Sequence, residues 1–160
     1  MWQVNHSGDW HHPTWHNEFV RCRILIILKL LEELGPALNL RSPASETAIA
    51  EPQCQLAWAF PIEYLSFLRA TNGCEGFPAT GDYIVLWPVE RLVEAQIGYG
   101  FPEFCPEAVA FGTNGGGEAF VFKRGNGHIA RMDLCSLDIK SAIEVGPLFT
   151  DFLRRGRPSD

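Results

Sequence analysis

The chain has 160 residues, 46% of them hydrophobic and 20% charged, which suits one globular domain and argues against a disordered chain. Its net charge of −6 is uneven, because residues 41–122 carry ten acidic and three basic side chains, whereas residues 123–160 carry seven basic and five acidic ones. The acidic middle disfavours direct binding of nucleic acid and favours a basic partner, although an acidic surface can also serve solubility alone.

Residues 1–18 are unusually rich in tryptophan and histidine. Clustered imidazoles can hold a transition metal, but the histidine spacing matches no closed zinc site and Pro13 would break a helix that aligned the ligands. We therefore expect residues 1–18 to be a loosely ordered extension without a metal. Its members are Trp2, His6, Trp10, His11, His12, Trp15 and His16.

An apolar helix is expected over residues 19–34, ended by Gly35-Pro36. Its run at 24–31 follows two arginines, as the core of an export signal would. Lys29 interrupts that run, two glutamates follow it, and it is too short to span a membrane. We predict a buried helix and then a connecting loop over 39–47, with no membrane as partner.

The cysteines point to a reducing compartment. They are widely spaced, form no CxxC pair and are odd in number, so one would stay unpaired in any disulfide scheme. We expect reduced, mostly buried thiols and a cytoplasmic protein. The cysteines are Cys22, Cys54, Cys74, Cys105 and Cys135.

Two further helices are predicted before the spacing of hydrophobic residues changes from a helical to a strand pattern. The first covers residues 48–59 and the second residues 61–70, where Pro61 suits the first helical position. Asn72-Gly73 supplies a residue able to take the left-handed conformation that closes a helix.

Strands dominate from residue 83 onward. The pattern predicts strands over 83–87, 109–111, 119–122 and 128–132, a helix opened by Pro88, an aromatic loop over 98–107, turns over 113–118 and 123–127, and a last helix over 147–155. Helices first, an antiparallel meander next and a closing helix indicate an α+β fold with N-terminal helices, a central mainly antiparallel sheet and a C-terminal helix.

Catalytic motifs are weak. The glycine-rich turn 113–118 lacks the Lys and Ser of a phosphate-binding loop and leads into a strand, so we interpret it as a turn requiring positive φ. GxSxG is absent from the sequence. Two catalytic alternatives remain. The first is a cysteine–histidine pair that folding would assemble from His128 and Cys74, Cys105 or Cys135. The second is general acid–base catalysis by carboxylates near the glycine-rich turn. We predict no enzyme.

Short motifs follow one another in a fixed order between residues 48 and 155. They are Ile49, Gln53, Leu56-Ala57, Phe60-Pro61, Tyr64, Phe67-Leu68, Asn72-Gly73, Val85-Leu86-Trp87, Glu90-Arg91-Leu92, the stretch 111–118, and Phe149, Phe152 and Leu153. In this order and spacing the chain resembles the SUKH superfamily, also known as the Smi/Knr cell-wall-assembly-regulator family. It departs from the family pattern where Gln53 replaces an acid, Ala57 a glycine and Asn114 an aspartate.

The resemblance implies function by binding. Bacterial members look like immunity proteins that neutralise a toxin, eukaryotic relatives act as interaction modules, and the family shares neither an enzymatic activity nor a cofactor. For this chain the implied partner is a basic toxin domain, for example a nuclease, whose active site would be occluded. Two alternatives remain: a small-ligand-binding or hydrolytic domain using carboxylates near the glycine-rich turn, and a regulatory scaffold without a toxin.

We place the partner-binding surface on the loops 73–83 and 98–107 and the turn 113–118, where acids and aromatics gather. Solvation alone is the competing explanation for these acids. The candidate residues are Glu75, Asp82, Tyr83, Trp87, Glu90, Glu94, Tyr99, Phe101, Glu103, Asn114 and Glu118.

Overall fold

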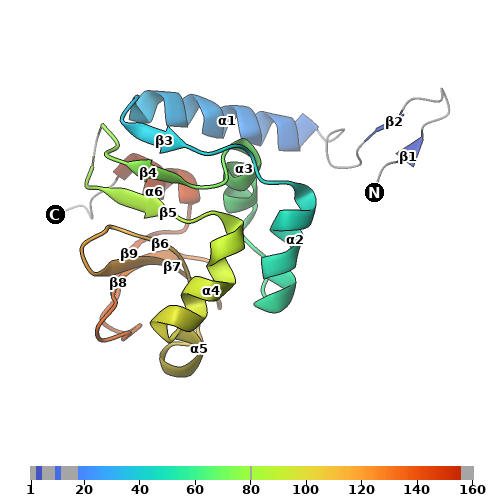
Figure 1. Ribbon diagram of the computed structural model, residues 1–160. Coiled ribbons are helices and arrows are strands. Elements are labelled where there is room, and N and C mark those ends of the chain that lie inside the picture. Colours follow the sequence, from blue (N-terminus) through green and yellow to red (C-terminus); the bar gives the residue numbers. More distant parts are fainter. Residues whose placement is uncertain (1–2, 5–9, 12–17, 80, 156–160) are drawn as a thin grey trace.

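The computed structural model describes residues 3–4, 10–11, 18–79 and 81–155 (Figure 1). The predicted α+β class is confirmed. The elements in chain order are β1 (Gln3–Val4), β2 (Trp10–His11), α1 (Glu18–Leu34), β3 (Leu38–Leu40), α2 (Glu46–Gln55), α3 (Ile62–Ala70), β4 (Cys74–Gly76), β5 (Ile84–Leu86), α4 (Val89–Tyr99), α5 (Phe101–Phe104), β6 (Ala108–Thr113), β7 (Glu118–Lys123), β8 (Ile129–Asp133), β9 (Ile143–Gly146) and α6 (Phe149–Arg155).

The main sheet is an antiparallel meander. Strands β3 to β9 lie in chain order, and each pairs antiparallel with the strand before it. β1 and β2 form a separate antiparallel pair within the segment predicted to be an extension. The histidine-rich remainder of that segment lies outside the described residues.

Aromatic rings join the helices to the sheet. Tyr64 of α3, Phe111 of β6, Phe122 of β7 and Phe149 of α6 are all buried, with neighbouring ring centroids 4.3 to 5.7 Å apart in the closest pairs. Such contacts lie in the range where aromatic pairs attract. α1 packs against both α3 and α6, and its apolar run forms the predicted helix.

Three short strands differ from the sequence prediction. β3, β4 and β9 have only three or four residues each, so they carry too few positions to show an alternating pattern. Part of the predicted loop 39–47 therefore belongs to β3. The predicted loop 98–107 likewise contains the single helical turn α5, which begins at Phe101.

The cysteine prediction was wrong in one respect. All five thiols are free, but Cys22, Cys54 and Cys135 are exposed and only Cys74 and Cys105 are buried. Cys54 lies on the outer side of α2, which buries Ile49 and Pro52, and Cys22 of α1 borders an open cavity.

Candidate functional site

Helix α4 is held to the sheet by a buried glutamine. Gln96 Nε2 donates to the carbonyl oxygen of Ala110 in β6 (2.7 Å), and Gln96 Oε1 accepts from the Ala110 N–H (3.0 Å). β5 turns away after Trp87, whose N–H still bonds Phe111 of β6. The glutamine amide thus satisfies backbone groups that a longer β5 would have paired.

The start of α4 is held by Asn72. Its Oδ1 accepts from the Val89 N–H (2.9 Å), which is one of the N–H groups that lack a partner within the helix. Asn72 Nδ2 donates to Glu90 Oε2 (2.9 Å). Gly73 follows with φ +87°, and a Cβ there would lie 2.4 Å from the Leu86 carbonyl oxygen. The prediction that this Asn-Gly pair closes α3 was wrong, because α3 ends at Ala70 and its cap residue Thr71 has an extended backbone with φ −151°. Asn72 caps α4 instead.

The outer side of α4 carries acids and an exposed isoleucine. Glu90, Glu94 and Ile97 recur at helical spacing, opposite the buried Val89 and Leu92. Ile97 is 68% exposed. Gln96, the residue before Ile97, occupies the inward position of this turn.

Exposed aromatic residues lie at the end of α4 and in α5. Tyr99 is 45% exposed and stacks on the buried Trp87, with centroids 5.8 Å apart and planes 11° apart. Phe104 of α5 is 66% exposed, next to the acidic Glu103. We call this set the α4–α5 surface: Glu90, Glu94, Ile97, Tyr99, Glu103 and Phe104.

Two predicted contact residues lie beneath the surface. Phe101 is 1% exposed and Trp87 is 6% exposed, so both belong to the core and neither presents a face to a partner. Phe104, in contrast, was absent from the predicted site. Its signal was Gly100, which has φ +81° and whose added Cβ would lie 2.9 Å from the Phe104 ring; the chain reverses there and turns Phe104 outward.

The remaining candidates gather at the glycine-rich turn. Asn114 Oδ1 accepts from the Gly116 and Glu118 N–H groups (2.8 and 3.1 Å), and Gly115 and Gly117 have the positive φ expected of this turn. The Tyr83 ring lies against Gly115, where a Cβ would be 3.1 Å from it. The exposed Asp82 precedes Tyr83.

The carboxylates at this turn already have partners. Glu118 accepts from the Asn114 amide (2.7 Å) and pairs with Arg131 of β8. Glu75 of β4 accepts a hydrogen bond from the Tyr83 hydroxyl, and this bond, with a smaller contribution from burial, raises the pKa of Tyr83. These interactions stabilise the turn and leave both acids engaged within the fold.

The candidates therefore form two groups and not one face. β6 begins at Ala108 beside α5 and ends at Thr113 beside the glycine-rich turn. At about 3.3 Å per residue, the two groups lie roughly 16 Å apart along the strand. Loop 98–107 therefore lies at one end of β6 and turn 113–118 at the other.

His128 and the Glu118 carboxylate, both considered for catalysis, lie at opposite ends of β7. His128 follows the turn at the far end of β7 from Glu118, and its Nδ1 lies 2.8 Å from Glu144. Burial raises the pKa of the Cys74 thiol to about 12, and burial, followed by the charge of Glu107, raises that of Cys105. Both shifts disfavour the nucleophilic thiolate at neutral pH.

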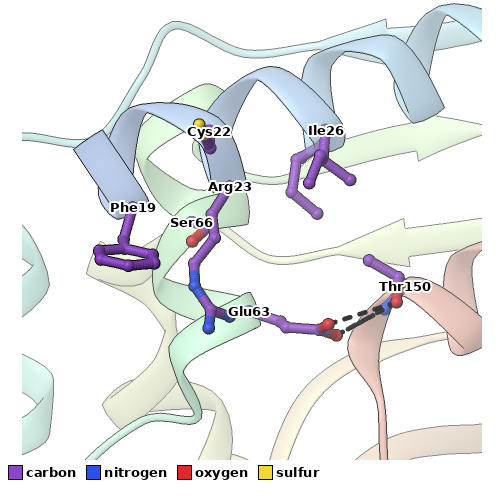
Figure 2. A pocket seen from close by; sticks show the side chains of 8 residues that line it. Phe19, Cys22, Arg23, Ile26, Glu63, Ser66 and Thr150 are labelled. Carbon is purple, nitrogen blue, oxygen red and sulfur yellow. Dashed lines mark hydrogen bonds between the residues drawn. The ribbon is translucent and has the colours of Figure 1, made fainter.

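A cavity of about 260 Å³ lies between α1, α3 and α6 (Figure 2). Its carboxylate, Glu63, accepts from the backbone N–H (3.0 Å) and hydroxyl (3.3 Å) of Thr150 and so holds the first turn of α6. Arg23 and Ser66 add the other polar groups, and the rest of the lining is mostly apolar. Neither His128 nor the carboxylates of the glycine-rich turn line this cavity.

The described residues contain no group of three or more His, Cys, Asp and Glu placed to hold a metal ion. None of their helices combines the length and apolarity needed to cross a membrane.

Comparison with known proteins identifies the family. A search of curated proteins found no match. The profile of the SMI1 / KNR4 family (SUKH-1) matches residues 43–155, which include every helix and strand from α2 to α6. The match covers more than half of the chain and agrees with the order of motifs found in the sequence. The chain belongs to the SMI1 / KNR4 family (SUKH-1).

Proposed function

We propose that this chain is an immunity-type protein that binds a basic toxin domain through the α4–α5 surface and occludes the active site of that toxin. The observation that carries the proposal is the exposure of Ile97 and Phe104, 68% and 66%, beside the carboxylates of Glu94 and Glu103. Exposed apolar side chains at the centre and charges at the rim are typical of a protein interface.

The rigidity of this surface supports the proposal. Gln96 fixes the middle of α4 to β6 and Asn72 fixes its start. A surface that is already ordered loses little conformational entropy on binding. The acids would speed the encounter with a cationic partner, and the apolar side chains would slow its release. Toxin neutralisation would take place in the cytoplasm, without a cofactor.

The first experiment tests the biological function. The chain is co-expressed with toxins encoded near its gene, and growth rescue and complex formation are measured. We expect rescue together with a stable complex. If no toxin is bound and growth is not rescued, the immunity function is wrong.

The second experiment tests the surface. Ile97→Ala and Phe104→Ala should each weaken toxin binding about tenfold, the loss typical of a truncated interface anchor. Glu94→Lys should slow association, and more so at low salt. Asp82→Lys is the matched control, because it reverses an exposed acid in the glycine-turn group. Weakening by Asp82→Lys without any effect of Glu94→Lys would place the interface at the other end of β6.

A further inference from the structure

Helix α1 exposes leucines on the side opposite its packed face. Its buried residues are Ile27, Leu30, Leu31 and Leu34, whereas Leu25 is 62% and Leu28 37% exposed. An isolated exposed leucine is common, but two on one helical stripe form an apolar seam. α1 lies before the segment 43–155 that the family profile matches.

The seam is flanked by opposite charges at matching distances. Arg21, Leu25, Leu28 and Glu32 are all exposed and follow one another at steps of four, three and four residues. Such spacing keeps all four on one side of the helix. The stripe has the same spacing from either end, with a cation at one end and an anion at the other.

We propose that α1 pairs antiparallel with α1 of a second copy of this chain, about a two-fold axis between Ile26 and Ile27. In that register Arg21 faces Glu32 of the second copy, and Leu25 packs against Leu28 of the second copy. Each contact occurs twice, as a symmetric dimer interface requires. The proposal concerns assembly and is independent of the toxin-binding function.

The charge order along α1 supports an antiparallel partner. A helix favours acidic residues near its N-terminus and basic residues near its C-terminus. The last turn of α1 contains Glu32 and Glu33 and no basic residue, while Arg21 and Arg23 follow closely on Glu18 of the first turn. Among the described residues, none forms an ion pair with Arg21 or Glu32. An antiparallel copy would place the missing opposite charge beside each end.

The geometry predicts a weak dimer. α1 has 17 residues and is therefore about 25 Å long. One helix face of this length buries less than the roughly 1,200 Å² of a typical stable interface, so we expect dissociation in the micromolar range.

The test measures molecular mass against concentration for the full chain by analytical ultracentrifugation. The wild type should dimerise, and Leu25→Glu should be monomeric at every concentration because it places charge in the apolar seam. Ile62→Glu is the matched control, since Ile62 is 56% exposed on α3 and away from the stripe; it should dimerise like the wild type. Circular dichroism checks that each variant is folded.

Charge reversal tests the register. Arg21→Glu and Glu32→Arg should each weaken self-association about tenfold, because both ends of the interface become repulsive. An equimolar mixture of the two variants should recover wild-type affinity, since every facing pair is then opposite in charge. A monomeric wild type, a dimer that Leu25→Glu leaves intact, or a mixture that does not recover would each overturn the proposal.

Discussion

Ala57 has a backbone conformation that favours glycine. It follows α2 with φ +49° and occupies the position where the family pattern has glycine. A Cβ in the left-handed region costs about 1–2 kcal/mol, part of which glycine recovers at the expense of greater freedom in the unfolded chain.

Ala57→Gly should therefore raise the free energy of unfolding by about 0.5–1 kcal/mol, measured by urea denaturation. Ala50→Gly is the control: Ala50 is equally exposed but lies inside α2, so glycine should cost about 1 kcal/mol there. A destabilised Ala57→Gly variant would contradict the strain at this residue.

Gln53 shows why another departure from the family pattern is tolerated. Its Oε1 accepts from the Phe60 N–H (2.8 Å) and its Nε2 donates to the Ile49 carbonyl (3.2 Å). A carboxylate at this position accepts the first bond but cannot donate the second. The glutamine thus keeps the bond that orders the segment after α2 and adds one within the helix.

At the scale of single elements, α4 depends on Asn72. Asn72→Ala removes the acceptor of the Val89 N–H, and loss of such a cap costs about 1 kcal/mol. We expect the urea midpoint to fall accordingly. Glu90→Ala removes only the partner of Asn72 Nδ2 and should change stability by less than about 0.5 kcal/mol. Equal losses in both variants would show that the surface bond, and not the cap, stabilises α4.

Strand β9 is tied to its neighbours through Glu144. The Lys123 ammonium and then the His128 ring, each 2.8 Å away, hold the pKa of the Glu144 carboxyl below its usual range. A carboxyl whose pKa is lowered by folding contributes stability that is complete above its unfolded pKa and is lost as the pH falls through its folded pKa.

Glu144→Gln should therefore flatten the fall in stability as the pH drops below about 4.5, the ordinary pKa of a glutamate, measured as urea midpoints. Some slope should remain, because bonds from the Ser141 hydroxyl and the Lys140 N–H also lower the pKa of Asp138. Glu94→Gln, which removes an exposed acid of α4, should leave the slope unchanged. Identical profiles for the wild type and Glu144→Gln would contradict the contribution of this cluster.

Element prediction succeeded where the sequence pattern was long. The run from Phe19 to Leu34 and the β-branched and aromatic residues of β5 and β7 indicated their structures directly. β4 and β9 were missed because each is short and stabilised by pairing with its neighbours, and such pairing is a tertiary contribution that a local pattern does not contain.

At the scale of the whole molecule, the fold class and family followed from the order of motifs, whereas the shape of the site did not. The predicted residues were grouped by charge and nearness in sequence. Tyr83 and Trp87 are four residues apart, but they flank opposite ends of β5. Tyr83 lies at the glycine-rich turn, whereas Trp87 is buried against Tyr99 of α4. Only the register of the sheet shows which residues lie at the same end of neighbouring strands.

The two proposed interfaces lie far from each other. Figure 1 shows α1 at the top of the molecule and α4 and α5 at the bottom. Pairing through α1 would therefore leave the α4–α5 surface of each copy accessible, and one dimer would present two equivalent surfaces to its partners.

The strand order also bears on how the chain folds. Since each strand of the main sheet pairs with the preceding one, the sheet can grow strand by strand as the ribosome releases the chain. β3 meets β4 only after α2 and α3 have been made, and β5 meets β6 only after α4 and α5. Helix α6 comes last in this order, and its Phe149 and Phe152 contact Phe111 and Phe120 of the sheet. Until α6 docks, those phenylalanines lack their cover, so the final residues of the domain complete its core.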